Sequence, residues 1–171
     1  GAIFAIEVLY FSSVSFKSII PSFLTAYIAY FTVEFFQIPH THYQQPYIPE
    51  LHLELLPWLL LVGILFGLTA RIFSTSVHYF SEIAKEFISF PPLRPFIGGL
   101  IFAAAIYFSG ATQYLGLGIP TIVESFQTAQ TGDVFLLKLI ATALILGTGF
   151  KGGEVTPLFF IGATLGSALA V

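Results

Sequence analysis

The sequence has 171 residues, of which 56% are hydrophobic and 9% are charged, with a formal net charge of −3. A soluble domain carries about 25% charged residues, so this composition excludes an ordinary soluble domain and predicts a membrane protein. The absence of Cys excludes disulfides, thiolate metal sites and cysteine nucleophiles, and six basic residues in an acidic chain argue against a nucleic-acid partner.

Six apolar stretches follow one another, separated by polar or Pro/Gly-rich connections. They cover residues 1–11, 18–36, 55–83, 93–108, 134–150 and 155–171. Several are shorter than the roughly 20 residues that cross hydrocarbon, and the segment 114–128 is too short to span. Short and broken apolar helices predict an all-α bundle with re-entrant elements. Both ends of the sequence lie inside apolar runs, as expected for an internal segment of a longer membrane protein.

The basic residues of the connections predict an orientation in the membrane. Connections that carry Lys or Arg alternate with connections 37–56 and 109–133, which carry only Glu and Asp. The positive-inside rule therefore makes the basic connections cytoplasmic. They hold Lys17, Lys85, Arg94 and Lys151. Two further basic residues, Arg71 and Lys138, lie within apolar stretches and do not bear on orientation.

The sharpest motif is the turn Gly147-Thr-Gly-Phe-Lys-Gly-Gly-Glu-Val-Thr-Pro157. Two apolar helices meet there, and Pro157 is well placed in the first turn of the second helix. The first N–H groups of a helix have no intrahelical partner and carry partial positive charge, so an anion suits this position. The alternative is a close-packed kink made of small residues.

The segment Gly153–Pro157 resembles the G-x-F-x-P element of the CLC chloride channel and transporter family, with Val155 in place of the usual Phe. The helix that follows and the opening segment 1–7 extend the resemblance over nearly the whole chain. It implies a CLC-like inverted-repeat bundle. Residues 1–54 would end the first repeat, with a helix tail, one spanning helix and an extracellular loop, and residues 55–171 would form most of the second. By this resemblance a halide anion lies at Gly153, Glu154, Val155 and Thr156.

Two acidic residues are candidates for a proton path. Glu154 stands where the family commonly has an apolar residue, and a Glu inside a membrane is a functional candidate. Gly-Glu-Val-Thr-Pro resembles the branch of the family that exchanges fluoride for protons, and a carboxyl beside the Thr156 hydroxyl suits a small, strongly hydrogen-bonding anion. The alternative is a carboxylate stabilised by the helix dipole. Glu7 is the second candidate, with a structural role at the interface as its alternative.

Two other patterns receive no functional assignment. Leu115–Pro120 resembles the family's G-S-G-I-P filter, but its place in the second repeat makes it the counterpart of that filter, so we do not expect it to contact the ion. Histidines and acids in a Pro-rich loop are not a strong metal signature, so no metal and no cofactor are expected. These are His40, His42, His52, Glu50 and Glu54.

Three functions stay open. The first is transmembrane halide transport by a CLC-type channel or anion/proton antiporter, the second is its fluoride-selective, proton-coupled form, and the third is an inactive or scaffold membrane segment. An unrelated transporter with inverted repeats is a further possibility. The resemblance implies no enzymatic activity. It implies chloride or fluoride, protons and the lipid bilayer as partners, a bacterial plasma membrane as the location, and a homodimer whose contact includes the helix at 18–36.

Overall fold

The computed structural model describes residues 16–39 and 52–170, and the chain divides into two compact units, residues 1–42 and 43–171. The described part of the first unit is the helix α2 (Phe16–Phe35), 20 residues long, in the predicted apolar stretch 18–36. The hydroxyls of Thr25 and Thr32 donate to carbonyl oxygens one turn earlier, at 2.7 Å each. These bonds satisfy polar groups inside an apolar helix. The predicted stretch 1–11 lies outside the described residues.

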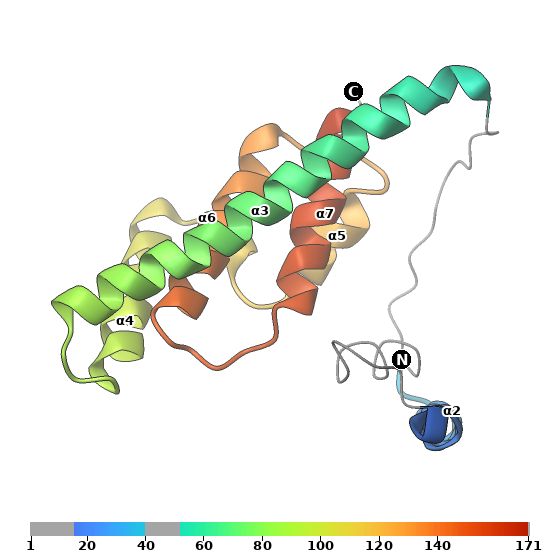
Figure 1. The fold of residues 1–171 in the computed structure, drawn as a ribbon, viewed down its shortest axis with the longest axis horizontal. Coiled ribbons are helices and arrows are strands. Elements are labelled where there is room, and N and C mark those ends of the chain that lie inside the picture. The colour runs from blue at the N-terminus through green and yellow to red at the C-terminus, as the bar shows by residue number, and fades with distance from the viewer. Residues whose placement is uncertain (1–15, 40–51, 171) are drawn as a thin grey trace. The chain divides into compact units, whose positions relative to one another are not determined.

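Over its described residues the second unit consists of helices and their connections, without strands, and it contains every apolar stretch predicted after residue 52 (Figure 1). Its elements are η1 (Leu53–Leu55), α3 (Leu56–Phe87), α4 (Leu93–Ser109), η2 (Thr112–Tyr114), α5 (Ile119–Glu124), α6 (Gly132–Gly147) and α7 (Val155–Leu169). Among the described helices, only the segment Leu53–Phe87 is long and apolar enough to cross a membrane by itself. The prediction of short helices, including one in 114–128, is confirmed.

Helix α3 extends beyond the predicted apolar stretch 55–83. It continues to Phe87 through a polar last turn. Lys85 Nζ lies 2.9 Å from Glu82 Oε1, which satisfies both side chains one turn apart. Arg94, in the first turn of α4, links this helix to the end of α3. Its Nε donates to the carbonyl of Ile88 at 2.9 Å.

Helix α6 is shorter than predicted at its C-terminal end. The apolar stretch runs to Phe150, but the helix ends at Gly147. The Thr148 hydroxyl donates back to the carbonyl oxygens of Leu144 and Ile145, at 2.9 and 3.0 Å. Gly149 then adopts a φ of 99°, a conformation that is unfavourable for residues with a side chain. The N–H groups of Gly149 and Phe150 donate to the carbonyl oxygens of Leu146 and Ile145, at 3.0 and 3.3 Å, so the helix ends before the apolar stretch does.

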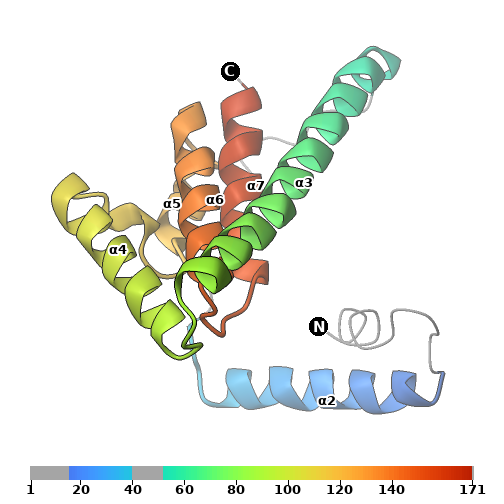
Figure 2. The same cartoon turned by 60° about the vertical axis from the view of Figure 1, so that its left-hand side comes forward.

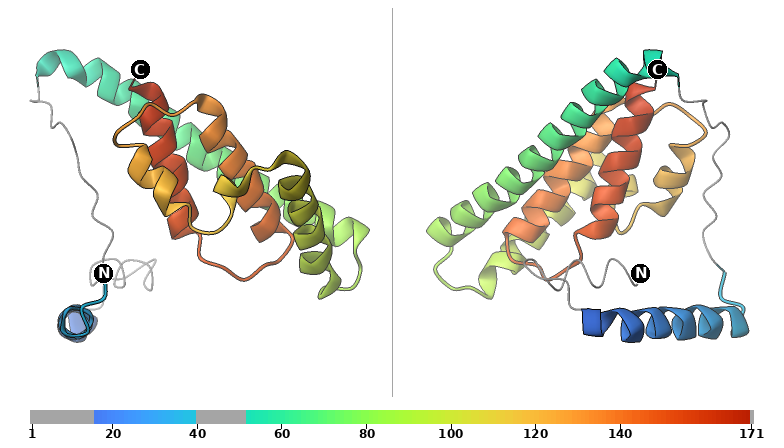
Figure 3. Two further views of the ribbon diagram at one scale, coloured as in Figure 1. Left: turned by 180° about the vertical axis from the view of Figure 1, so that it is seen from behind. Right: turned by 45° about the vertical axis from the view of Figure 1, so that its right-hand side comes forward.

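Helix α6 lies at the centre of the second unit, with α3, α4 and α7 packed around it (Figures 2 and 3). The core includes two clusters of buried side chains, and α6 contributes to each of them. One cluster comprises Tyr114, Ile122, Val134 and Phe160, and the other Phe73, Leu139 and Ile161. Helix α7 contributes Phe160 to one cluster and Ile161 to the other, and it packs against both α6 and α5.

Large apolar side chains cover much of the outside of the second unit. On α3 they include Trp58, Leu60 and Ile64, each more than 60% exposed. Contiguous apolar surface of this kind is rare on soluble monomers and is typical of surfaces that meet lipid or other apolar helices.

Candidate functional site

The first turn of α7 carries backbone donors without acceptors. Within the described part of the chain, no hydrogen bond is made by the N–H groups of Glu154, Val155 and Thr156. Pro157 has no N–H, and the first helical bond of this end runs from the Leu158 N–H to the Glu154 carbonyl at 3.1 Å. No side chain caps the helix. This end therefore presents several N–H groups and the positive end of a helix dipole to whatever lies in front of it.

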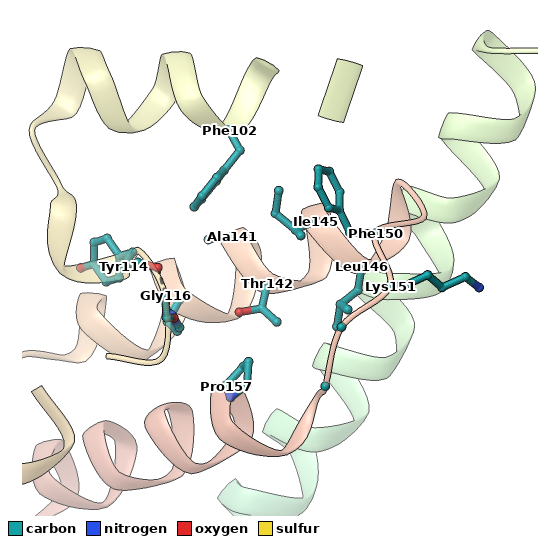
Figure 4. A pocket seen from close by; sticks show the side chains of 13 residues that line it. Phe102, Tyr114, Gly116, Ala141, Thr142, Ile145, Leu146, Phe150, Lys151 and Pro157 are labelled. Atoms are coloured by element: carbon teal, nitrogen blue, oxygen red, sulfur yellow. Dashed lines mark hydrogen bonds between the residues drawn. The ribbon is translucent and has the colours of Figure 1, made fainter. Parts of the chain in front are cut away.

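A pocket of about 240 Å³ adjoins this end of α7 (Figure 4). The side chains of α4 and α6 form one part of its wall, and the connection between α6 and α7 forms another. It is lined by Phe102, Tyr114, Gly116, Lys138, Ala141, Thr142, Ile145, Leu146, Phe150, Lys151, Gly152, Gly153 and Pro157. The lining is mostly apolar with a few polar groups, which is typical of small-ligand sites.

The predicted anion-binding residues are contiguous, but they do not share one environment. Gly153 lines the pocket, whereas Glu154, Val155 and Thr156 are not among its lining residues. Glu154 and Val155 are exposed and Thr156 is half-buried. These three residues follow directly after the pocket-lining Gly153 in the chain, and the Glu154 side chain is open to solvent or to further elements. Glu7, the other candidate for a proton path, lies outside the described residues.

Sequence reasoning passed over Lys138, which is the most unusual residue of the site. Its side chain is 3% exposed, and its Nζ donates to the carbonyl oxygens of Tyr114 and Gly116, at 2.9 Å each. The same Nζ lies 5.0 Å from the ring centroid of Phe160 on α7, within range of a cation–π contact. A lone Lys inside an apolar stretch was itself a signal, because such a charge is costly in a membrane and must find partners.

The filter-like segment 115–120 meets the same pocket. Gly116 and Gly118 have φ values of 60° and 68°, so the segment forms a tight turn that only glycines adopt easily. The turn leads into α5, a helix of six residues. Gly116 lines the pocket together with Gly153, so this turn and the connection into α7 border the same space. That this turn does not contact the ion stays a prediction.

The histidine-rich loop is described only in part. His52 and Glu54 lie at the start of the second unit, next to and within η1. Residues 40, 42 and 50 lie outside the described range. Among the residues that the structure describes, no group of three His, Asp or Glu side chains is placed to hold a metal ion.

The fold and the site define a class of protein, an integral membrane bundle with short apolar helices that meet at a donor-bearing turn. The chain belongs to the voltage gated chloride channel family, whose model matches residues 1–171. It is 42% identical to a chloride/fluoride channel protein of Pseudomonas syringae pv. tomato over 99% of this chain and 39% of that protein. It is 35% identical to the voltage-gated ClC-type chloride channel ClcB of Escherichia coli over 61% of this chain and 25% of that protein.

A solved structure shares the fold as well. The crystal structure of a CLC-type fluoride/proton antiporter superimposes with a TM-score of 0.85 and 32% sequence identity, over 95% of this chain and 42% of that one. The chain thus spans about two fifths of the length of the Pseudomonas syringae protein and of the antiporter. The CLC-like all-helical fold predicted from the sequence is confirmed by this likeness.

Proposed function

We propose that the chain is part of a halide transporter of the chloride channel type, and that the first turn of α7 forms one wall of its anion site. The observation that carries this proposal is the set of unpartnered N–H groups at Glu154, Val155 and Thr156, beside a pocket lined by Gly152 and Gly153. Backbone donors at a helix start bind anions without the mobility of a charged side chain. The names of the relatives, a chloride/fluoride channel and ClC-type chloride channels, support halide as the anion.

A second, narrower function is exchange of fluoride for protons. It is favoured by Glu154, a carboxyl exposed at the start of the same helix, with Thr156 in the first turn. Fluoride forms strong hydrogen bonds, and a carboxyl that alternates between its protonated and ionised forms can serve both ions. The fluoride/proton antiporter that shares the fold supports this choice. Glu154 is then one end of a proton path to which Glu7 would also belong.

Three further expectations belong to the same proposal. Residues 1–54 would end one inverted repeat and residues 55–171 form most of the next, which would place α7 near the bilayer midplane. The full-length protein would be a homodimer in a bacterial plasma membrane. Its activity would be transport and not catalysis of a chemical reaction.

Replacing Glu154 by Gln tests the proton role. In liposomes containing the purified full-length protein, we expect halide flux to persist while the number of protons moved per halide falls by about tenfold or more, because the titratable group is removed from an intramembrane path. An ion-selective electrode and a pH-sensitive dye measure the two fluxes in one sample. Glu86→Gln, which neutralises an exposed carboxylate at the end of α3, is the matched control and should leave the ratio unchanged.

The same experiment separates the candidate functions. A wild-type protein without saturable halide flux would favour the scaffold reading and contradict the transporter. Saturable flux without proton movement in the wild type would favour a channel. An unchanged proton ratio in Glu154→Gln would contradict the role of this carboxyl in coupling.

A further inference from the structure

Lys138 carries a buried positive charge that no carboxylate balances. Among the residues that the structure describes, its Nζ has no Asp or Glu within ion-pair distance, and its partners are the carbonyl oxygens of Tyr114 and Gly116 and the ring of Phe160. Carbonyl dipoles satisfy the ammonium hydrogens but leave the unit charge in place. Neutral donors would satisfy the same carbonyls at a lower desolvation cost, so bracing the turn does not by itself require a cation.

This charge borders the same pocket as the start of α7. Lys138, Gly152, Gly153 and Pro157 all line it, so the Lys138 side chain and the connection into α7 border one space of about 240 Å³. Lys151 also lines the pocket, but its side chain is exposed and points away from the other lining residues (Figure 4). The buried charge of Lys138 is therefore the one that solvent and salt screen least.

We propose that Lys138 determines the affinity of the anion site at the start of α7, by holding a buried positive charge beside the pocket that adjoins this end of the helix. This inference rests on the proposed function, because it concerns the same anion. A charge separation of one pocket width, about 8 Å for a sphere of 240 Å³, serves as the scale for the estimate. At an effective dielectric constant of about 20, a unit charge at that separation changes a dissociation constant by roughly 30-fold. The carbonyl dipoles of Tyr114 and Gly116 oppose the field of the ammonium and reduce this effect, so we expect a change of about tenfold in the dissociation constant.

The test compares charge-removing and charge-keeping variants of the full-length protein in liposomes. Lys138→Gln and Lys138→Met remove the charge, and Gln keeps two donors for the carbonyls of Tyr114 and Gly116. Both should raise the KM for halide by about tenfold while the maximal rate changes less, and Lys138→Arg should restore the KM to near the wild-type value. Lys151→Met is the matched control. Because Lys151 is exposed, this variant should raise the KM less than Lys138→Met does, and its effect should disappear at high salt.

A second arm leaves Lys138 and its contacts in place, so it does not depend on whether the first variants fold. Thr142 lies one turn after Lys138 on α6, is half-buried and lines the pocket (Figure 4). Thr142→Lys adds a second positive charge to the pocket and should lower the KM for halide several-fold relative to Thr142→Gln, a neutral side chain of comparable reach.

The outcomes distinguish this inference from the proposed function. Saturable halide flux in the wild type together with the expected KM changes supports both. Saturable flux with the same KM in Lys138→Gln, or in Thr142→Lys and Thr142→Gln alike, overturns the role of Lys138 and leaves the transporter intact. A Lys138→Arg protein that is as impaired as Lys138→Met also overturns it, because then shape and not charge is decisive. Absence of saturable flux in the wild type overturns the proposed function itself.

Discussion

Replacing Gly118 with Ala is expected to destabilise the folded protein by about 2–5 kcal/mol and to abolish most transport. Gly118 has a φ of 68°, where a side chain costs about 1–2 kcal/mol. A Cβ at this position would also overlap the ring of Phe160, a side chain with no exposed surface. That ring packs against Tyr114 and below Lys138, so it cannot move without disturbing the turn that lines the pocket.

Gly110 supplies the matched control for this substitution. Its φ is also 68°, but nothing lies within 4 Å of the Cβ that Ala would add. Gly110→Ala should therefore show only the backbone cost, and the difference between the two variants isolates the overlap with Phe160. Thermal unfolding of the purified protein in detergent measures both. A Gly118→Ala protein as stable as Gly110→Ala would contradict the packing described for this turn, whereas partial recovery in Gly118→Ala with Phe160→Leu would support it.

Replacing Gly147 with Ala should have the second largest effect, a loss of about 1–3 kcal/mol from overpacking where α3 crosses α6. An added Cβ would lie 2.6 Å from Phe80 Cβ and 2.9 Å from the carbonyl oxygen of Val77. Because one of these atoms belongs to the backbone of α3, no side-chain rotation relieves the overlap. The two helices must separate, and α6 also holds α7. Small residues at helix crossings serve this close approach in membrane proteins.

The control for this crossing is Gly67→Ala in the interior of α3, where nothing lies within 4 Å of the new Cβ. Gly67→Ala gains helix propensity of up to about 1 kcal/mol in a helix interior. Gly147 is the last residue of α6 and its Ala variant gains less, so its destabilisation relative to wild type is the measure of packing. We expect Gly67→Ala to be neutral or stabilising in thermal unfolding and Gly147→Ala to be destabilised. Equal unfolding temperatures would show that α3 and α6 do not cross at Gly147.

Local features of the sequence predicted the helices well. The pair Gly152 and Gly153 followed by Pro157 located the start of α7, because these residues break one helix and permit the next. Helix α6 ends three residues before the predicted apolar stretch does, because the N–H groups of Gly149 and Phe150 turn back to the carbonyl oxygens of Leu146 and Ile145. Apolar composition does not show where such a turn falls.

The site was predictable only in the part that is contiguous in sequence. The donors at Glu154 and Val155 follow from the motif and from helix geometry. The pocket does not, because it needs Lys138 to meet the carbonyls of Tyr114 and Gly116, which lie 24 and 22 residues earlier. Such partners are brought together by tertiary packing, and a hydropathy pattern contains no information about them. The isolated charge of Lys138 could have been recognised in the sequence as unusual, whereas its hydrogen-bond partners could not have been identified.

The central claim is that the backbone N–H groups at the start of α7 bind the anion, and an amide-to-ester replacement at Val155 tests it most directly. The ester removes one N–H and leaves every side chain in place. Because a hydrogen bond to a charged group contributes about 1.5–3 kcal/mol, halide affinity in the full-length protein should fall by about 10- to 100-fold. The same replacement at Ala163, within α7, controls for loss of an ordinary helical bond. Equal halide affinities for the Val155 ester and the wild type would contradict the account.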